Sequence, residues 1–231
     1  FKKPKSRSNQ ANFRLEGLSF HITNAFDHPT VLKAFEVEDD YIIMETGFKA
    51  MSLNEAFCKY PADKCIDSLL KAIDLLPLIW MEGYFYGDFK LDNIIVFYDS
   101  LKNFHTKVID LTLNSFDRIN SNGFGRTPGF FFEFNEVCKE IKRLKLKDID
   151  YPKIESKIAI SHDLKAIAHV IYNVLYNFQV DNILNCKKSQ LLLEKAYTIE
   201  NTTDLEVSDT DFSSENFEGL KSILHQIKHQ L

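Results

Sequence analysis

The chain has 231 residues, of which 45% are hydrophobic and 26% are charged, and its formal net charge is −5. This length and composition are typical of one large globular domain, or of one domain with a small appendage. The acidic balance argues against nucleic acid as the main partner, because phosphate backbones require a basic face. No apolar run approaches the roughly 20 residues of a membrane span, so we expect no membrane partner either.

Hydrophobic periodicity predicts both strands and helices in the first half of the chain. The expected elements are a helix over 13–26, strands over 31–37 and 41–46 joined by an acidic turn, and a long buried helix over 63–82. Ser52 followed three residues later by Glu55 predicts the capped start of a short helix between them. Pro77 lies inside the long helix and should bend it or remove one of its hydrogen bonds.

The second half is predicted to be mainly helical. A loop within 84–98 leads into an apolar strand, and a second strand over 106–111 follows within reach of a hairpin. The remaining expected elements are a long loop over 114–130 and helices over 135–147, 161–178, 187–197 and 215–230. A few strands followed by many helices indicate an α+β domain that is mostly helical.

One loop and the end of a neighbouring strand carry the residues that phosphoryl transfer from ATP requires. Such transfer needs a carboxylate to accept the proton of the substrate hydroxyl and an amide oxygen for Mg²⁺ a few residues later. Asp88 and Asn93 lie five positions apart, and Lys90 between them could neutralise charge on the transferred phosphate. A second carboxylate must bind Mg²⁺ from the end of an adjacent strand, and Asp110 has that position.

From about residue 13 to residue 178 the chain resembles protein kinases, and the motifs above carry this resemblance. Further similar features are Glu16 at the position of the helix glutamate that pairs with the ATP-binding lysine, His28-Pro29 after that helix, Tyr41 to Glu45 as fifth strand and hinge, and Thr127 to Phe130 at the end of an activation segment. Asp163 is similar in place to the aspartate that opens the central helix and holds the backbone of the catalytic loop. The resemblance implies a degenerate N-lobe over 1–46 and a helical C-lobe over 47–231.

Finer features resemble the Bub-type spindle-checkpoint kinases. They are Gly87-Asp88 in the catalytic loop, Ile109-Asp110-Leu111 without a following glycine, Gly129-Phe130 after the activation loop, and a tyrosine late in the central helix. The kinetoplastid kinetochore pseudokinase of that branch is the relative that these matches suggest. The resemblance implies a nuclear protein at the kinetochore, with kinetochore components as protein partners and a role in chromosome segregation.

Other features depart from an active kinase. The 231 residues contain no Gly-x-Gly-x-x-Gly phosphate loop and no apolar strand that carries an ATP lysine. Thr112 replaces the glycine that follows Asp110-Leu111, and no arginine follows Arg143 to pair with the end of the activation segment. We therefore expect a pseudokinase scaffold or allosteric module that uses no cofactor, in which Asp88, Lys90, Asn93, Asp110 and Glu16 are vestigial and Asp163 is structural.

Two alternatives remain open at this stage. The first is an active Mg-ATP-dependent Ser/Thr kinase, in which Asp88 and Lys90 are catalytic and Asn93, Asp110 and Glu16 bind Mg-ATP. Because the sequence begins with Phe1 rather than Met, it could be a fragment whose N-lobe lies upstream. The second alternative is an inhibitor that mimics half of a kinase and docks on a true one.

Overall fold

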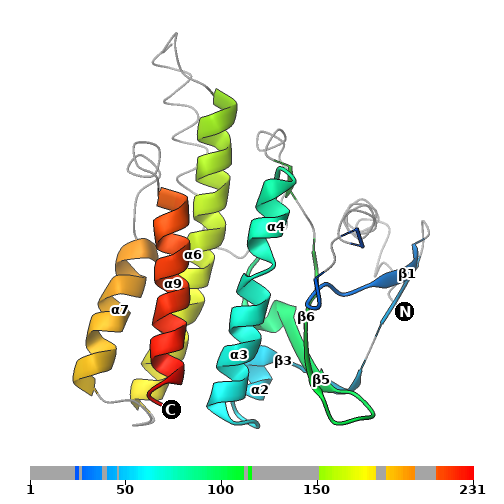
Figure 1. Cartoon of the computed structure of the whole chain (residues 1–231), viewed down its shortest axis with the longest axis horizontal. Coiled ribbons are helices and arrows are strands. Elements are labelled where there is room, and N and C mark those ends of the chain that lie inside the picture. The colour runs from blue at the N-terminus through cyan, green and yellow to red at the C-terminus, as the bar shows by residue number, and fades with distance from the viewer. Residues whose placement is uncertain are drawn as a thin grey trace. The chain divides into compact units, whose positions relative to one another are not determined.

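The computed structural model describes residues 24–25, 28–37, 41–45, 47–111, 114–115, 151–180, 186–200 and 212–231. These residues form small sheets and several helices, which is the mixed α and β composition that the sequence predicted. The chain forms two compact units (Figure 1). The first comprises the described residues of Phe1–Tyr86 and Lys90–Leu113, and the second comprises those of Gly87–Phe89 and Asn114–Leu231.

The first unit contains an antiparallel strand pair, which confirms the two strands predicted over 31–37 and 41–46. β1 (Ala34–Val37) pairs with β2 (Ile42–Met44), and the register shifts between Ala34 and Glu36. Leu32, Ala34 and Ile42 form a buried cluster on which Met44 and Ile109 pack. Asn24 and Ala25 form a turn, and the rest of the helix predicted over 13–26 lies outside the described residues.

A second sheet in this unit has the strand order β3-β5-β6. It consists of β3 (Phe48–Ser52), β5 (Ile94–Tyr98) and β6 (Phe104–Val108), and β5 pairs with both neighbours in antiparallel fashion. The β5–β6 ladder runs from the pair Ile94–Val108 to the pair Tyr98–Phe104. This ladder confirms the predicted hairpin, whereas β3 was not predicted.

The helices of the first unit confirm the cap at Ser52 and correct the prediction for 63–82. Ser52 Oγ accepts a hydrogen bond of 3.2 Å from the backbone N–H of Glu55 at the start of α2 (Leu53–Ala56). The predicted single helix is two helices, α3 (Ala62–Ile73) and α4 (Leu76–Met81). Pro77 does not bend a continuous helix, because it lies in the first turn of α4, where its missing N–H has no intrahelical partner to lose.

Two short elements lead to the candidate site, and α3 supports the sheet behind it. β4 (Tyr84–Phe85) follows α4, and the 3₁₀ helix η2 (Leu91–Asn93) directly precedes β5. α3 packs on β5 and β6, and its Ser68 hydroxyl accepts a hydrogen bond of 2.9 Å from Thr106 Oγ1.

Among the described residues of the second unit, three helices pack on one another and lie side by side in Figure 1. They are α6 (Tyr151–Val180), α7 (Cys186–Glu200) and α9 (Phe212–Lys228). The strand β7 (Asn114–Ser115) also belongs to this unit. The structure confirms the helix predicted over 161–178, and its seven expected core residues are all buried: Leu164, Ile167, Ala168, Ile171, Val174, Leu175 and Phe178. The predicted helix over 135–147 and most of the loop predicted over 114–130 lie outside the described residues.

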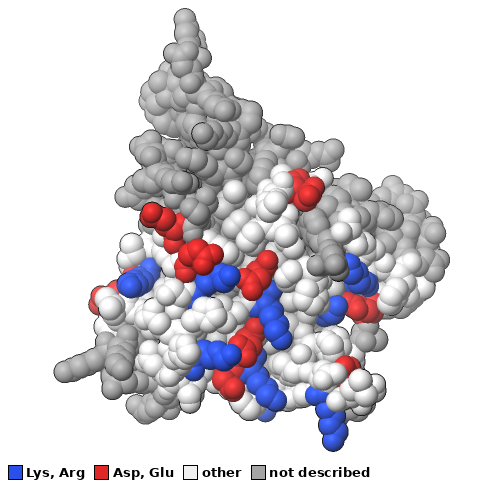
Figure 2. Space-filling view, viewed as in Figure 1, with Lys and Arg blue, Asp and Glu red and all other residues white. Residues whose placement is uncertain are grey.

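Charges of both signs are interleaved over the face shown in Figure 2. Among the residues that the structure describes, no helix is both long enough and apolar enough to cross a membrane.

Candidate functional site

Asn93 and Asp110 lie at the same end of the β5–β6 hairpin. η2 ends at Asn93 and β5 begins at the next residue, while β6 ends at Val108, two residues before Asp110. Beyond the last ladder pair, the backbone N–H of Ile109 donates a hydrogen bond of 2.9 Å to the carbonyl oxygen of Asn93. The structure therefore places the backbones of Asn93 and Asp110 at one end of the hairpin, with Asn93 buried and Asp110 exposed.

Asp110 has an unusual backbone conformation. Its φ angle is 51°, in the left-handed region that few residues other than glycine occupy. Asp is among the residues that tolerate this region, because its short polar side chain can form local hydrogen bonds. The Asp110 side chain is exposed, and Leu111 immediately after it is buried. Such strained backbone is concentrated at functional sites, so we treat the Asp110 turn as part of the candidate site.

Tyr86 binds the backbone carbonyl of Ile109, the residue that precedes Asp110. The Tyr86 hydroxyl donates a hydrogen bond of 2.6 Å to the carbonyl oxygen of Ile109, and the Tyr86 side chain is only 1% exposed. Both backbone polar groups of Ile109 are thus bonded, its N–H to Asn93 and its C=O to Tyr86. These two bonds fix the direction in which the chain enters the Asp110 turn.

The segment 28–31 runs along the open edge of β6. Val31 forms a parallel bridge with Val108, and the backbone N–H of Val108 donates a bond of 2.9 Å to Thr30 O. His28 Nδ1 lies 2.6 Å from Thr30 Oγ1. Burial lowers the pKa of His28 below its ordinary value, and this effect outweighs the opposing influence of Asp74.

The half-buried lysines of this region are engaged in structural contacts. Lys107 Nζ forms an ion pair of 2.6 Å with Glu45 Oε1 and donates a bond of 3.0 Å to Val31 O. Lys33 Nζ donates a bond of 3.0 Å to Asn24 O, and the Lys33 backbone N–H donates to the same Glu45 oxygen at 3.0 Å. These contacts join Glu45, the residue that follows Met44 at the end of β2, to Lys33 before β1 and to Lys107 in β6.

In the second unit, Asp163 of α6 holds the loop residue that precedes Asp88. Asp163 is fully buried, and its Oδ1 accepts a hydrogen bond of 2.7 Å from the backbone N–H of Gly87. This is the kind of backbone bond expected of Asp163 from the kinase resemblance. Gly87 has a φ angle of 77°, a conformation that a residue with a side chain would adopt only with strain. The glycine and the buried carboxylate together set the backbone direction at Asp88, whose side chain is partly exposed.

Lys90 caps η2 in an extended conformation and is partly exposed, and Glu16 lies outside the described residues. Sequence reasoning missed the bond from the Tyr86 hydroxyl to the carbonyl oxygen of Ile109 just after the end of β6. It also missed the ion pair between Lys107 and Glu45, for which the only signal was opposite charge on two predicted strands.

The donor chemistry at Asn93 and Asp110 suits Mg²⁺ only when other ligands contribute. Carboxylate and amide oxygens are hard ligands of the type that Mg²⁺ accepts, and waters and phosphate oxygens usually supply the remainder. The part of the chain that the structure describes contains no cluster of three or more His, Cys, Asp or Glu residues able to hold a metal ion. These residues could thus hold Mg²⁺ against a bound nucleotide, but they do not form a complete metal cage.

No protein-family model matches this chain, and no curated protein matches it either.

Proposed function

We propose that this chain is a pseudokinase: a kinase-like domain that acts as a protein-binding scaffold or allosteric module at the kinetochore. Its N-lobe would be small and degenerate and its C-lobe mainly helical. Its partners would be kinetochore proteins in chromosome segregation and spindle-checkpoint signalling.

The observation that carries this proposal is the juxtaposition of Asn93 and Asp110 across the β5–β6 hairpin. A kinase needs an amide and a carboxylate at this relative position to hold Mg²⁺ on the phosphates of ATP. The bond between Ile109 N–H and Asn93 O sets the two residues at one hairpin end. The bond from Gly87 to Asp163 supports the same interpretation, because it is the contact that a kinase-like catalytic loop requires.

A non-catalytic role is supported by what surrounds these residues. Phosphoryl transfer depends almost entirely on positioning and on stabilising charge, so an enzyme needs cations and backbone N–H groups around the phosphates. The 231 residues include no Gly-x-Gly-x-x-Gly segment to supply those N–H groups. Lys33 and Lys107 are committed to Asn24 and Glu45 respectively. The remnant site can therefore maintain loop structure without clamping a nucleotide.

The kinetochore assignment is supported by short motifs that resemble the Bub-type kinases. Gly87 replaces the usual arginine before Asp88, and its positive φ gives a physical reason for a glycine there. Thr112 replaces the glycine after Asp110-Leu111. A domain that keeps its framework but lacks the phosphate cover is suited to presenting a rigid surface to other proteins.

Replacement of the endogenous chain by charge-neutral variants tests this function. Asp88→Asn and Asp110→Asn remove the two carboxylates while keeping side-chain size, and Asn also tolerates the left-handed conformation at Asp110. We expect cells carrying the double variant to segregate chromosomes normally and to concentrate the protein at kinetochores. The matched control is Asp92→Asn, an exposed residue of the same loop. A segregation defect in the double variant alone, at unchanged melting temperature and protein level, would indicate an active kinase. Absence of the unmodified protein from kinetochores would contradict the kinetochore role.

A further inference from the structure

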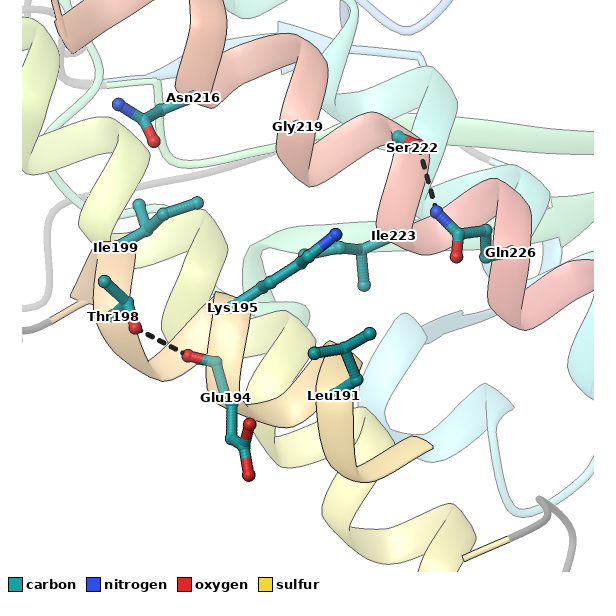
Figure 3. Close-up of a pocket in the computed structure, with 10 residues that line it drawn as sticks. All are labelled: Leu191, Glu194, Lys195, Thr198, Ile199, Asn216, Gly219, Ser222, Ile223 and Gln226. Carbon is teal, nitrogen blue, oxygen red and sulfur yellow. Dashed lines mark hydrogen bonds between the residues drawn. The ribbon is translucent and has the colours of Figure 1, made fainter. Parts of the chain in front are cut away.

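Helices α7 and α9 border a groove of about 500 Å³ in the second unit (Figure 3). Its apolar lining includes Leu191 and Ile199 from α7 and Ile223 from α9. Leu191 is 57% exposed, whereas Ile199 and Ile223 are buried. The groove is thus a partly apolar surface bordered by one exposed leucine.

Gly219 gives the α9 side of this groove an open notch. A Cβ atom added at Gly219 would have no heavy atom within 4 Å apart from its own helix backbone and chain neighbours. A glycine in a helix interior costs about 1 kcal/mol relative to alanine. No close contact with another described residue requires a glycine at this position. The notch leaves room for a side chain that comes from outside the described structure.

The exposed face of α7 is self-complementary. Leu191, Glu194, Lys195 and Thr198 follow the spacing i, i+3, i+4 and i+7, which places them on one helix face, and all four are exposed. When two such helices lie antiparallel about a two-fold axis between positions 194 and 195, each Glu194 meets the other copy's Lys195. Each Leu191 then meets the other copy's Thr198. The sequence of this face therefore matches its own reverse in both charge and size.

The charged pair at the centre of this face is available for such a contact. Lys195 forms no ion pair with any residue that the structure describes, and its side chain extends across the groove toward Ile223 (Figure 3). The Glu194 side chain points away from the groove, and its Oε1 accepts only a long hydrogen bond of 3.3 Å from Gln190 among described residues. Neither charge would have to break an ion pair with a described residue in order to pair across two copies.

We propose that the occupant of this face is a second copy of the chain, bound through antiparallel α7 helices. Glu194 and Lys195 form two reciprocal ion pairs across the two-fold axis. Leu191 of each copy enters the other groove beside Thr198, where Gly219 leaves space. An interface of this size is expected to be reversible, because only a small apolar area is buried. The inference does not rest on the proposed function, since it uses only the helices of the second unit.

Sedimentation equilibrium of the 231-residue chain tests the dimer. We expect a dimer mass at about 100 µM and dissociation on dilution. Leu191→Glu should raise the dissociation constant at least tenfold, because each substitution acts twice in a two-fold interface (about 1.4 kcal/mol per tenfold). The matched control is Leu101→Glu, another exposed leucine, which lies between β5 and β6 and should leave the equilibrium unchanged. A chain that stays monomeric at about 1 mM, or one that Leu191→Glu does not affect, would overturn the proposal.

Charge reversal and notch filling test the geometry of the interface. Glu194→Lys and Lys195→Glu should each weaken the dimer, and the double reversal should restore it because opposite charges again meet across the axis. Gly219→Phe should weaken the dimer by filling the notch; an added Cβ meets no heavy atom within 4 Å, and the melting temperature of the variant checks that its monomer stays folded. Failure of the double reversal to restore association would contradict the antiparallel arrangement. A Gly219→Phe chain that dimerises as before would contradict the entry of Leu191 into the groove.

Discussion

The backbone N–H of Gly87 donates a hydrogen bond of 2.7 Å to Oδ1 of Asp163, although 76 positions separate the two residues in the sequence. The bond joins a loop residue with positive φ to a carboxylate that is wholly buried in α6. A buried charge is tolerated only where hydrogen bonds compensate for its lost hydration. The loop that carries Asp88 therefore depends on α6 for its conformation.

Asp163→Ala should lower the free energy of unfolding by about 2 kcal/mol, because a hydrogen bond to a charged group is lost and the Gly87 N–H loses its acceptor. Urea denaturation monitored by circular dichroism measures this change. Asp163→Asn keeps an acceptor oxygen at the same position and should cost clearly less. Equal costs for the two substitutions would show that the bond to Gly87 is not what stabilises the loop.

Tyr86→Phe should destabilise the first unit by about 1 kcal/mol, because the partly buried Ile109 carbonyl loses its donor. The same urea measurement applies, and Tyr84→Phe is the matched control on a partly exposed neighbour. Because the lost bond fixes the entry to the Asp110 turn, amide hydrogen exchange near Leu111 should also become faster. Unchanged exchange there would mean that the Tyr86 hydroxyl does not hold the turn.

Gly47→Ala should cost about 1–3 kcal/mol, because an added Cβ would overlap the ring of Phe97. Combining it with Phe97→Leu in a double-mutant cycle should show that the two changes are not additive, since the smaller side chain relieves the overlap. Gly83→Ala serves as the comparison. Its cost comes from a φ of 79° with nothing within 4 Å, so Phe97→Leu should not relieve it. Additive costs for Gly47→Ala and Phe97→Leu would refute the steric explanation.

Asp99 should make the β5–β6 turn sensitive to acid. Its carboxylate lies 2.9 Å from both His105 Nε2 and Asn103 Nδ2, and it accepts backbone bonds of 2.8 Å from Leu101 and Asn103. Hydrogen bonds from His105, and next from Asn103, hold the pKa of Asp99 well below its usual range. Since the folded pKa lies below the unfolded one, this stabilisation is complete above about pH 4. It is lost as the pH falls through the folded pKa.

Urea titrations at pH 7 and pH 3 measure this effect. Asp99→Asn should be less stable than the unmodified chain at pH 7 and should lose less stability on acidification, because the titrating carboxylate is gone. The exposed Asp92→Asn should leave the acid dependence as it was. Identical acid dependence in Asp99→Asn and the unmodified chain would contradict the role of this carboxylate.

Hydrophobic periodicity predicted the elements whose buried face is formed by apolar residues at regular spacing. The apolar face of 161–178 has seven residues at helical spacing, and burial of all seven follows from that spacing. The break between α3 and α4 was not predictable in this way. Leu75 and Leu76 continue the apolar pattern through the break, and both are buried. β3 was missed because Lys49 has a φ of 53° and the register shifts between Phe48 and Met51, so the segment lacks regular alternation.

The candidate site likewise contains one relation that the sequence could predict and several contacts that it could not. The relation between Asn93 and Asp110 could be predicted from the two flanking strands, because a tight antiparallel hairpin brings its outer ends together. The contacts of Tyr86 with Ile109 and of Lys107 with Glu45 depend on tertiary packing between segments whose register no local pattern specifies. The role of Asp163 was predicted only from the resemblance to kinases, since nothing in its own neighbourhood indicates a partner 76 positions away.

The melting temperature of the chain with and without Mg-ATP tests the pseudokinase proposal most directly. A ligand that binds only the folded chain adds about 2.7 kcal/mol at 100 times its dissociation constant, so nucleotide binding would be readily visible. We expect no shift at millimolar Mg-ATP, for either the unmodified chain or Asp110→Asn. A clear upward shift that Asp110→Asn abolishes would contradict the proposal, because Asp110 would then be holding Mg²⁺ on a bound nucleotide.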